Sequence, residues 1–274
     1  MQAEHYLQTG DLGKALADLT DAIRSDPSKV ELRIFLFQLL SVLGQWERAI
    51  TQLNVAAEMD SDALLMAQVY RPAINCEVLR SSVFQGQRTP LIFGEPLDWM
   101  VGLIQVPGLI AAGKPEAAAE LRDRAFEASP AVSGRIDGEK FNWIADADAR
   151  LGPILEAIVD GKYYWIPFER IRKIQIEKPA NLRDVVWTPA TFIWSNQGEA
   201  VGLIPSRYPG SETETESVFQ MGRKTDWRDA GNDFYFGVGQ RMLATDQGEY
   251  PLMAVREVII DSLDDPSEEV STDG

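Results

Sequence analysis

The 274-residue sequence contains one cysteine, Cys76, and one histidine, His5. A single cysteine excludes an internal disulfide, and one residue of each type cannot form a cysteine–histidine metal cluster. Cys76 has no histidine or basic residue beside it in the sequence, so we expect a structural thiol rather than a nucleophile. His5 lies near the amino terminus, where chains fray, and no serine–histidine–aspartate set can be built around it.

Motifs for nucleotide binding and acyl transfer are also missing. The sequence has no P-loop, no G-x-G-x-x-G and no G-x-S-x-G. The nearest approach is "FGVGQRM", residues 236–242, in which Arg241 and Met242 follow the two glycines. We therefore expect no cofactor and no catalytic or metal-binding residue.

Long hydrophobic runs and an excess of positive charge are absent as well. No run reaches the roughly 18 apolar residues of a membrane span, and "MQAEHYLQTGDLGK" lacks the basic and apolar regions of a signal peptide. We therefore expect a cytoplasmic protein that binds no membrane. The net charge of −16 would repel nucleic acid, which argues against nucleic acid as a partner.

The first half of the sequence contains an internal repeat. "GDLGKALADLTDAIRSDP" from Gly10 and "GQWERAITQLNVAAEMDS" from Gly44 match at an offset of 34 residues, which is the period of a tetratricopeptide repeat. The matched positions are the two glycines, Ala15 and Ala49, Leu19 and Leu53, Ala22 and Ala56, and Pro27 and Ser61. The glycine would separate two helices, and the alanines would allow the helices to cross closely.

A third copy of the pattern begins at Gly113, with "GKPEAAAELRDRAFEASP". Between the second and third copies, residues 62–86 read as one long helix and residues 97–112 as another, separated by the irregular "QGQRTPLIFGEP". The first half is thus predicted to be a helical array with a degenerate middle unit. Such arrays present a concave surface that binds peptides or helices.

The second half changes character, because short β-rich runs alternate there with Gly, Pro and Asn. The runs are "YYWIPF", "IRKIQIE", "VVWTPATFIWS", "EAVGLIPSRY", "SVFQMGRKT", "RMLATD" and "PLMAVREVII". We predict a multi-domain α and β protein: a tetratricopeptide-like α-helical array at 1–134, then a mainly antiparallel β, barrel-like α+β domain at 135–260. The acidic stretch "DSLDDPSEEVSTDG", 261–274, is predicted to be a disordered tail.

The stretch "FNWIADADARLGP", residues 141–153, alternates between apolar odd-numbered positions and mostly polar even-numbered ones. This period of two predicts a strand with one buried and one polar face, on which Asp146 and Asp148 lie about 7 Å apart beside Arg150. The small alanines beneath large aromatics suggest that something packs closely on the apolar face. A helix is the rival, because it would pair Asp146 with Arg150 at i, i+4.

The acid pair leaves three interpretations open. A calcium loop is not among them, because Arg150 and Leu151 occupy positions that need an oxygen ligand and a glycine. A carboxylate pair for glycan hydrolysis, using Asp146 and Asp148, is allowed by the spacing. We favour a solvated or inter-domain polar face, and keep a partner contact through Asp146, Asp148 and Arg150 as the next alternative.

Several long motifs of the second half resemble the ImpE family, also called TagJ or SciE-type accessory proteins of type VI secretion systems. They are "FNWIADADARLGPILEAIVDGKYYWIPFERI", "LRDVVWTPA", "GLIPSRYPGSE" and "GRKTDW". The resemblance extends from about Leu7 to Ile260. In "SNQGEA" the family pattern leads us to expect a glycine where Gln197 stands.

This resemblance implies a non-enzymatic adapter. Members of the family are cytoplasmic, resemble binders of the N-terminal helix of the small contractile-sheath subunit, and are linked to the AAA+ ATPase ClpV that recycles the sheath. The expected partners are therefore the sheath subunit and ClpV, with direct or indirect contact to ClpV left open. The alternatives are a carboxylate-based hydrolase using Asp146 and Asp148, and a purely structural homo-oligomeric scaffold.

Overall fold

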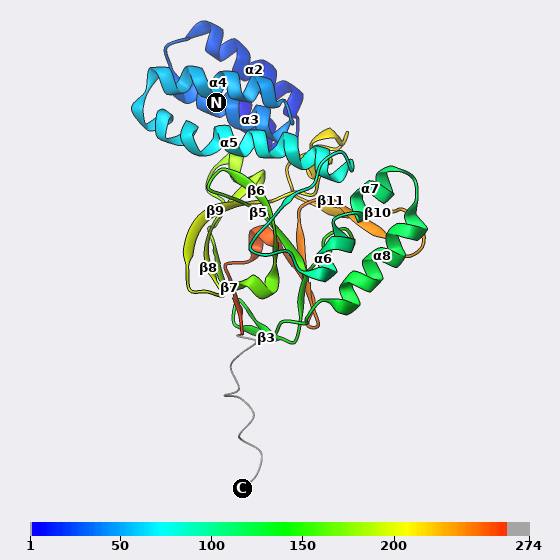
Figure 1. The fold of residues 1–274 in the computed structure, drawn as a ribbon. Coiled ribbons are helices and arrows are strands. Elements are labelled where there is room, and N and C mark those ends of the chain that lie inside the picture. Colours follow the sequence, from blue (N-terminus) through cyan, green and yellow to red (C-terminus); the bar gives the residue numbers. More distant parts are fainter. Residues whose placement is uncertain (1, 262–274) are drawn as a thin grey trace.

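The computed structural model describes residues 2–261, which form a helical half packed against a β-rich half (Figure 1). The helices are α1 Gln2–Thr9, α2 Leu12–Ser25, α3 Val30–Val42, α4 Trp46–Met59, α5 Ser61–Phe84, α6 Asp98–Leu103, α7 Val106–Ala111, α8 Pro115–Ala128 and α9 Ser217–Gln220. In Figure 1, α2–α5 lie on one end of the β structure, and α6–α8 run along its side.

The predicted repeat is present as two helical hairpins, α1–α2 and α3–α4, followed by the long helix α5. Asp11 caps α2 and Asp60 caps α5 by accepting backbone N–H bonds. Gly44 separates α3 from α4 with a φ of 65°, which favours glycine. A Cβ atom there would also lie 2.5 Å from Cγ of Glu212, so the β-rich half approaches the repeat closely at this glycine.

Two details of the helical prediction need correction. The helix expected at residues 97–112 is broken into α6 and α7, and the third repeat copy supplies α8, which packs against both of them. The segment after α5 also provides a strand, β1 (Leu91–Ile92), that joins the β structure by pairing with β6 (Lys162–Pro167). The predicted division at 134 therefore separates segments that share one sheet, and it stays a prediction.

The strands are β1 Leu91–Ile92, β2 Gly134–Ile136, β3 Glu139–Phe141, β4 Ile144–Asp146, β5 Ile154–Val159, β6 Lys162–Pro167, β7 Ile171–Ile176, β8 Trp187–Trp194, β9 Glu199–Pro205, β10 Thr225–Asp229, β11 Tyr235–Gly239, β12 Met242–Thr245, β13 Glu249–Pro251 and β14 Glu257–Ile260. Short 3-10 helices are η1 Phe168–Arg170, η2 Leu182–Val185, η3 Ser211–Thr213 and η4 Leu252–Ala254.

The main sheet has the strand order β1-β6-β5-β9-β8-β7-β14-β2-β3. All its pairs are antiparallel except β1 with β6. A three-stranded sheet, β13-β12-β4, and the β10–β11 hairpin complete the β half. The mainly antiparallel prediction is confirmed, and no closed barrel is found within residues 2–261.

One predicted strand is wrong: "SVFQMGRKT" begins with the helix α9, and strand β10 starts only at Thr225. The predicted acidic tail lies, from residue 262 onward, outside the described residues. None of the helices in the described range is long and apolar enough to cross a membrane.

Two hydrophobic clusters hold the fold together. One joins the helical half to the near side of the sheet, where the fully buried Trp187 packs on Trp46 and Tyr70 at ring distances of 6.0 and 5.7 Å. The other lies on the opposite side of the sheet, among residues such as Phe192 and Val258. Since the first cluster contains side chains of both halves, burial of apolar surface couples them.

Candidate interaction site

The stretch 141–153 forms a short strand and a tight turn. Strand β4 pairs with β12, and the chain then turns so that Asp146 bridges to Gly152. Asp146, Asp148 and Arg150 are at most 6% exposed. Of the predicted solvated or inter-domain polar face, the solvated form is therefore wrong, because the side chains of Asp146, Asp148 and Arg150 point into the protein.

Asp148 is held inside by bonds that build the turn. Its Oδ1 accepts from the backbone N–H and from Nε of Arg150, both at 2.9 Å, and its Oδ2 accepts from Nη2 of Arg150 at 2.6 Å. The backbone N–H of Gly237 donates to the same Oδ2 at 2.9 Å. Arg150 in turn lies over the rings of Phe84 and Phe236. This charge pair is thus a structural element that ties the turn to α5 and β11.

Asp146 faces Arg241, which is fully buried and donates to Oδ2 of Asp146. Its Oδ1 accepts from the Tyr208 hydroxyl at 3.1 Å and from the backbone N–H of Asp148 at 2.9 Å. Burial raises the pKa of Asp146 to about 6, because it outweighs the attraction of Arg241, and the nearby Asp148 adds to the increase. Arg241 also donates to Glu156, so its positive charge is shared between two carboxylates.

Glu156 of β5 lies at the centre of this charge network. It accepts from Arg80 of α5 at 2.7 and 2.9 Å, from Arg241, and from the Tyr163 hydroxyl. Burial alone would raise the pKa of Glu156, but the charges of Arg80 and Arg241 lower it to about 2. The network thus connects a helix of the repeat array to the β half.

The network continues along α5 through Glu77, whose carboxylate pairs with Arg80 at 3.3 Å and accepts from Nε1 of Trp187 at 3.0 Å. Burial raises the pKa of Glu77 despite the neighbouring Arg80. Nε1 of Trp165 donates to the Tyr163 hydroxyl at 2.7 Å. Within this network, the carboxylates of Glu77 and Glu156 and the ring donors of Trp165 and Trp187 therefore all have partners, as burial requires.

This geometry gives no support to the hydrolase alternative. Asp146 and Asp148 are closed off from solvent and already accept hydrogen bonds on both oxygens, so a substrate has no free carboxylate to approach. In the part of the chain that the structure describes, no group of three or more His, Cys, Asp or Glu could hold a metal ion. Burial raises the pKa of Cys76 to about 12, which agrees with the expected structural thiol.

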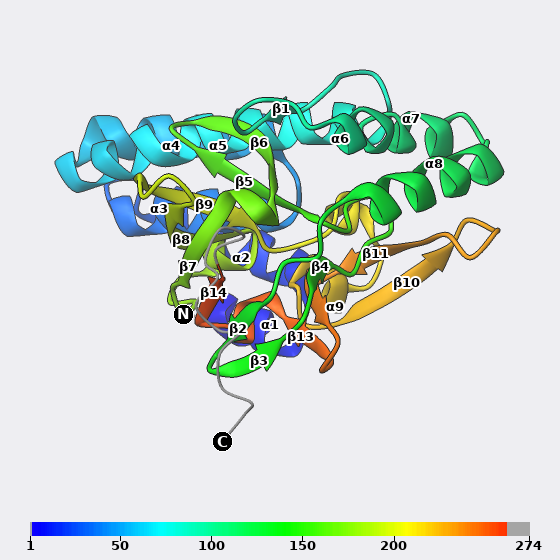
Figure 2. The ribbon, with the colours of Figure 1, turned by 60° about the horizontal axis from the view of Figure 1, so that its bottom comes forward.

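The opposite side of the same stretch lines a groove of about 600 Å³ between β4 and α8. Ala145, Ala147 and Ala149 are half-buried along it, and Trp143 is 40% exposed. The remaining lining comes from Arg122, Asp123, Phe126, Ser129, Pro130, Ala131, Ile144, Asp146, Asp148, Gly152, Pro153, Asp233, Tyr235 and Ala244. Figure 2 shows α8 beside β4, with the β10–β11 hairpin extending along it. The apolar row that the alternation predicted is thus present, but none of residues 2–261 covers it fully.

One face of the helical array, that of α3, is by contrast covered by the β half. The carboxy-terminal half of α3 is buried, and Gln38 accepts from the backbone N–H of Arg183 in η2 at 3.2 Å. Arg207 donates to the carbonyl oxygen of Val42 at 2.8 Å. Side chains of the β half therefore occupy the α3 face of the repeat array.

The sequence analysis did not identify four residues of this charge network: Glu77, Arg80, Glu156 and Arg241. Their signal is a charge inside an apolar run, as in "ILEAIV" around Glu156. Such a charge is rare in a buried strand unless it is paired. The sequence alone does not identify the partner, because Arg80 and Glu156 are 76 residues apart.

Comparisons with known proteins were made for the whole chain. A tetratricopeptide repeat family model matches residues 6–69, and the model of the ImpE protein family matches residues 138–259. The chain is 48% identical over 264 residues to the type VI secretion system accessory component TagJ of Pseudomonas aeruginosa, covering 96% of this chain and 92% of that protein.

The fold resembles the crystal structure of protein VPA1032 from Vibrio parahaemolyticus, with a TM-score of 0.88 and 25% identity. The match covers 96% of this chain and 98% of that one, so the packing of helices on sheet is shared along nearly the whole chain. Together with the identity to TagJ, these matches show that the chain belongs to the ImpE/TagJ family.

Proposed function

We propose that the protein is a non-enzymatic adapter of a type VI secretion system, which binds the N-terminal helix of the small contractile-sheath subunit and links the sheath to the recycling ATPase ClpV. One observation carries this proposal: 96% of the chain aligns at 48% identity with a protein named as a type VI secretion accessory component. Tetratricopeptide-like helices on the same chain suit a protein that acts through protein partners.

Titration calorimetry tests the first part of the proposal. A synthetic peptide with the sequence of the sheath subunit's N-terminal helix is titrated into the full-length protein, with a scrambled peptide as control. We expect a Kd in the micromolar range or tighter for the native peptide and no heat of binding for the scrambled one. Absence of binding by the native peptide to folded protein would contradict the proposal.

The link to ClpV needs a separate measurement. Immobilised protein is incubated with purified ClpV, once alone and once with the small sheath subunit. Capture in both samples would indicate direct contact, and capture only with the sheath subunit would indicate indirect contact. Failure in both samples would leave an adapter for the sheath without a connection to the ATPase.

The other functions considered make different predictions. A hydrolase acting through Asp146 and Asp148 would need both carboxylates to reach a substrate, and both are buried and paired. A homo-oligomeric scaffold would give a multiple of the 30.5 kDa chain mass in light scattering without any sheath subunit. The mass measured with and without that subunit separates the scaffold from the adapter.

The partner-binding role suggested for Asp146, Asp148 and Arg150 stays a prediction. Asp146 and Asp148 border the groove, although their charged groups point into the protein. We expect them to act on a partner through the position of the intervening alanines rather than by direct ion pairs.

A further inference from the structure

Resting on the adapter function proposed above, we propose that the groove between α8 and β4 binds the partner helix, as an amphipathic helix whose apolar stripe is flanked by basic residues. The repeat array does not offer its α3 face, because Arg183 and Arg207 of the β half already bond to that helix. A partner helix on that face would have to displace these contacts.

The shape of the groove suits a helix. Its floor carries small side chains, Ala145, Ala147 and Ala149, which allow a helix backbone to approach closely. Two partly exposed aromatic side chains line the groove, Trp143 at 40% and Tyr235 at 44%. Exposed aromatic anchors beside a groove are typical of the residues that contribute most binding energy.

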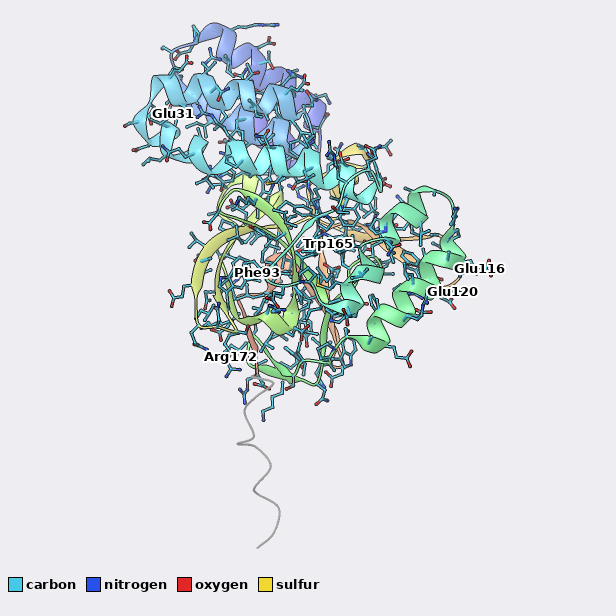
Figure 3. The ribbon with its side chains drawn as sticks, viewed as in Figure 1. Glu31, Phe93, Glu116, Glu120, Trp165 and Arg172 are labelled. Atoms are coloured by element: carbon cyan, nitrogen blue, oxygen red, sulfur yellow. The ribbon has the colours of Figure 1, made fainter. Side chains whose placement is uncertain are left out.

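The charged residues at the groove indicate which side chains should flank the apolar stripe of the partner helix. Asp123 and Asp233 line the groove and are exposed, whereas the lining cation Arg122 is held against the wall by Asp123 and by the carbonyl oxygen of Asp233. Exposed acids continue along α8 at Glu116 and Glu120, which point outward from the helix (Figure 3). A helix with basic residues on both sides of its apolar stripe would therefore complement the groove.

A second groove, of about 510 Å³, lies between α5 and the sheet and is the competing surface. Its exposed apolar side chains are aliphatic, with Val69 at 51% and Val201 at 74% exposure, and the polar Gln68 and Asp160 are exposed beside them. The aromatic residue among its lining, Tyr70, is buried against Phe37 and Trp187. This groove therefore lacks an exposed aromatic anchor and serves as the internal comparison.

The test uses calorimetry on the full-length protein and the sheath-subunit peptide. Trp143→Ala is expected to raise the Kd at least tenfold, as loss of an aromatic anchor does, and Val201→Ala is expected to change it less than twofold. Trp143 lies outside both hydrophobic clusters, so the variant should fold, and unchanged circular dichroism and thermal melting verify this.

A second pair of variants tests the charge argument. Asp123→Lys should weaken binding about threefold or more near 0.15 M salt, and the effect should shrink as salt screens the charges. Glu31→Lys makes the same change in net charge on α3, far from α8 (Figure 3), and should change the Kd less than twofold.

The outcomes separate this inference from the adapter function. If the peptide binds the wild type and Trp143→Ala equally well, or if Val201→Ala is the variant that loses binding, the groove is wrong and the adapter function stands. A peptide with a central proline that still binds would overturn the helical form of the ligand. If the wild type binds no peptide, both proposals are overturned.

Discussion

Replacing Glu156 with glutamine removes the charge that Arg80 and Arg241 share, while it keeps the size of the side chain. The new amide would also place donors against two guanidinium groups. The pKa of Glu156 falls from an ordinary 4.5 to about 2 in the folded protein, and this difference corresponds to about 3 kcal/mol of folding stability at neutral pH. Removing one partner of a buried ion pair costs a similar 3–5 kcal/mol or so.

The pH dependence of this loss has a definite sign. Because the folded-state pKa is lowered, the stabilisation by Glu156 is fully present above pH 4.5 and disappears as the pH falls towards 2. Glu156→Gln should therefore unfold about 3 kcal/mol more easily than wild type at pH 7 and at pH 5, and the gap should narrow below pH 4.5. Urea unfolding followed by tryptophan fluorescence measures this, since Trp165 lies next to the network.

An exposed glutamate provides the matched control. Glu199 begins β9 at the surface, and Glu199→Gln should change the unfolding free energy by no more than about 0.5 kcal/mol. If Glu156→Gln behaves like this control, the carboxylate is not a structural charge. Its burial between two arginines would then need another explanation.

Three further variants test other parts of the structure by the same urea assay. Burial raises the pKa of Asp146 from 3.8 to about 6. The protonated side chain therefore stabilises the fold fully below pH 3.8, and this stabilisation is lost as the pH rises through 6. Relative to Asp146→Asn, the free energy of unfolding of the wild type should fall by roughly 3 kcal/mol between pH 4 and pH 7. A constant difference across this range would contradict it. Gln197 has a φ of 66°, so Gln197→Gly should stabilise the protein by up to about 1 kcal/mol, and a lowered urea midpoint would refute that. Gly152→Ala would place a Cβ 2.1 Å from Cζ of Phe126, whereas a Cβ at Gly138 meets no atom within 4 Å. Both glycines have a positive φ, so the clash should lower the free energy of unfolding of Gly152→Ala by about 1–3 kcal/mol more than that of Gly138→Ala. Equal losses of stability would show that Phe126 moves aside.

Local patterns predicted the helical half well. The 34-residue period located the repeated helices α2 and α4, and a capping residue followed by a run of apolar positions located α5; Asp11 caps α2 and Asp60 caps α5. The same reasoning failed at 97–112, where the chain bends at Ile104 and Gln105 between α6 and α7. It also missed β1, whose two residues acquire strand geometry only by pairing with β6. Such a short strand depends on its partner, which no local pattern contains.

The position of the candidate groove could be predicted only in part. The alternation in 141–153 separated the alanines from the charged residues, but after Phe141 the stretch is a strand only at 144–146, and the alanines line a groove instead of a buried face. The close packing on the alanines stays a prediction. The interpretation of this period-two pattern then assumed that the polar side chains face water. That assumption fails where charges neutralise each other inside the protein, and Arg241 lies 95 residues beyond Asp146.

The inward charges decide which way the stretch faces. Strand β4 ends at Asp146, so strand alternation does not extend to Asp148. Asp146 and Asp148 are fixed inward by Arg241, Arg150 and the backbone N–H of Gly237, whereas the half-buried Ala145, Ala147 and Ala149 line the groove. An apolar row on the outside is unfavourable for an isolated protein. Its position opposite α8 is understandable if the proposed partner helix covers it, because the charge network holds Asp146 and Asp148 inside and leaves the alanines lining the groove.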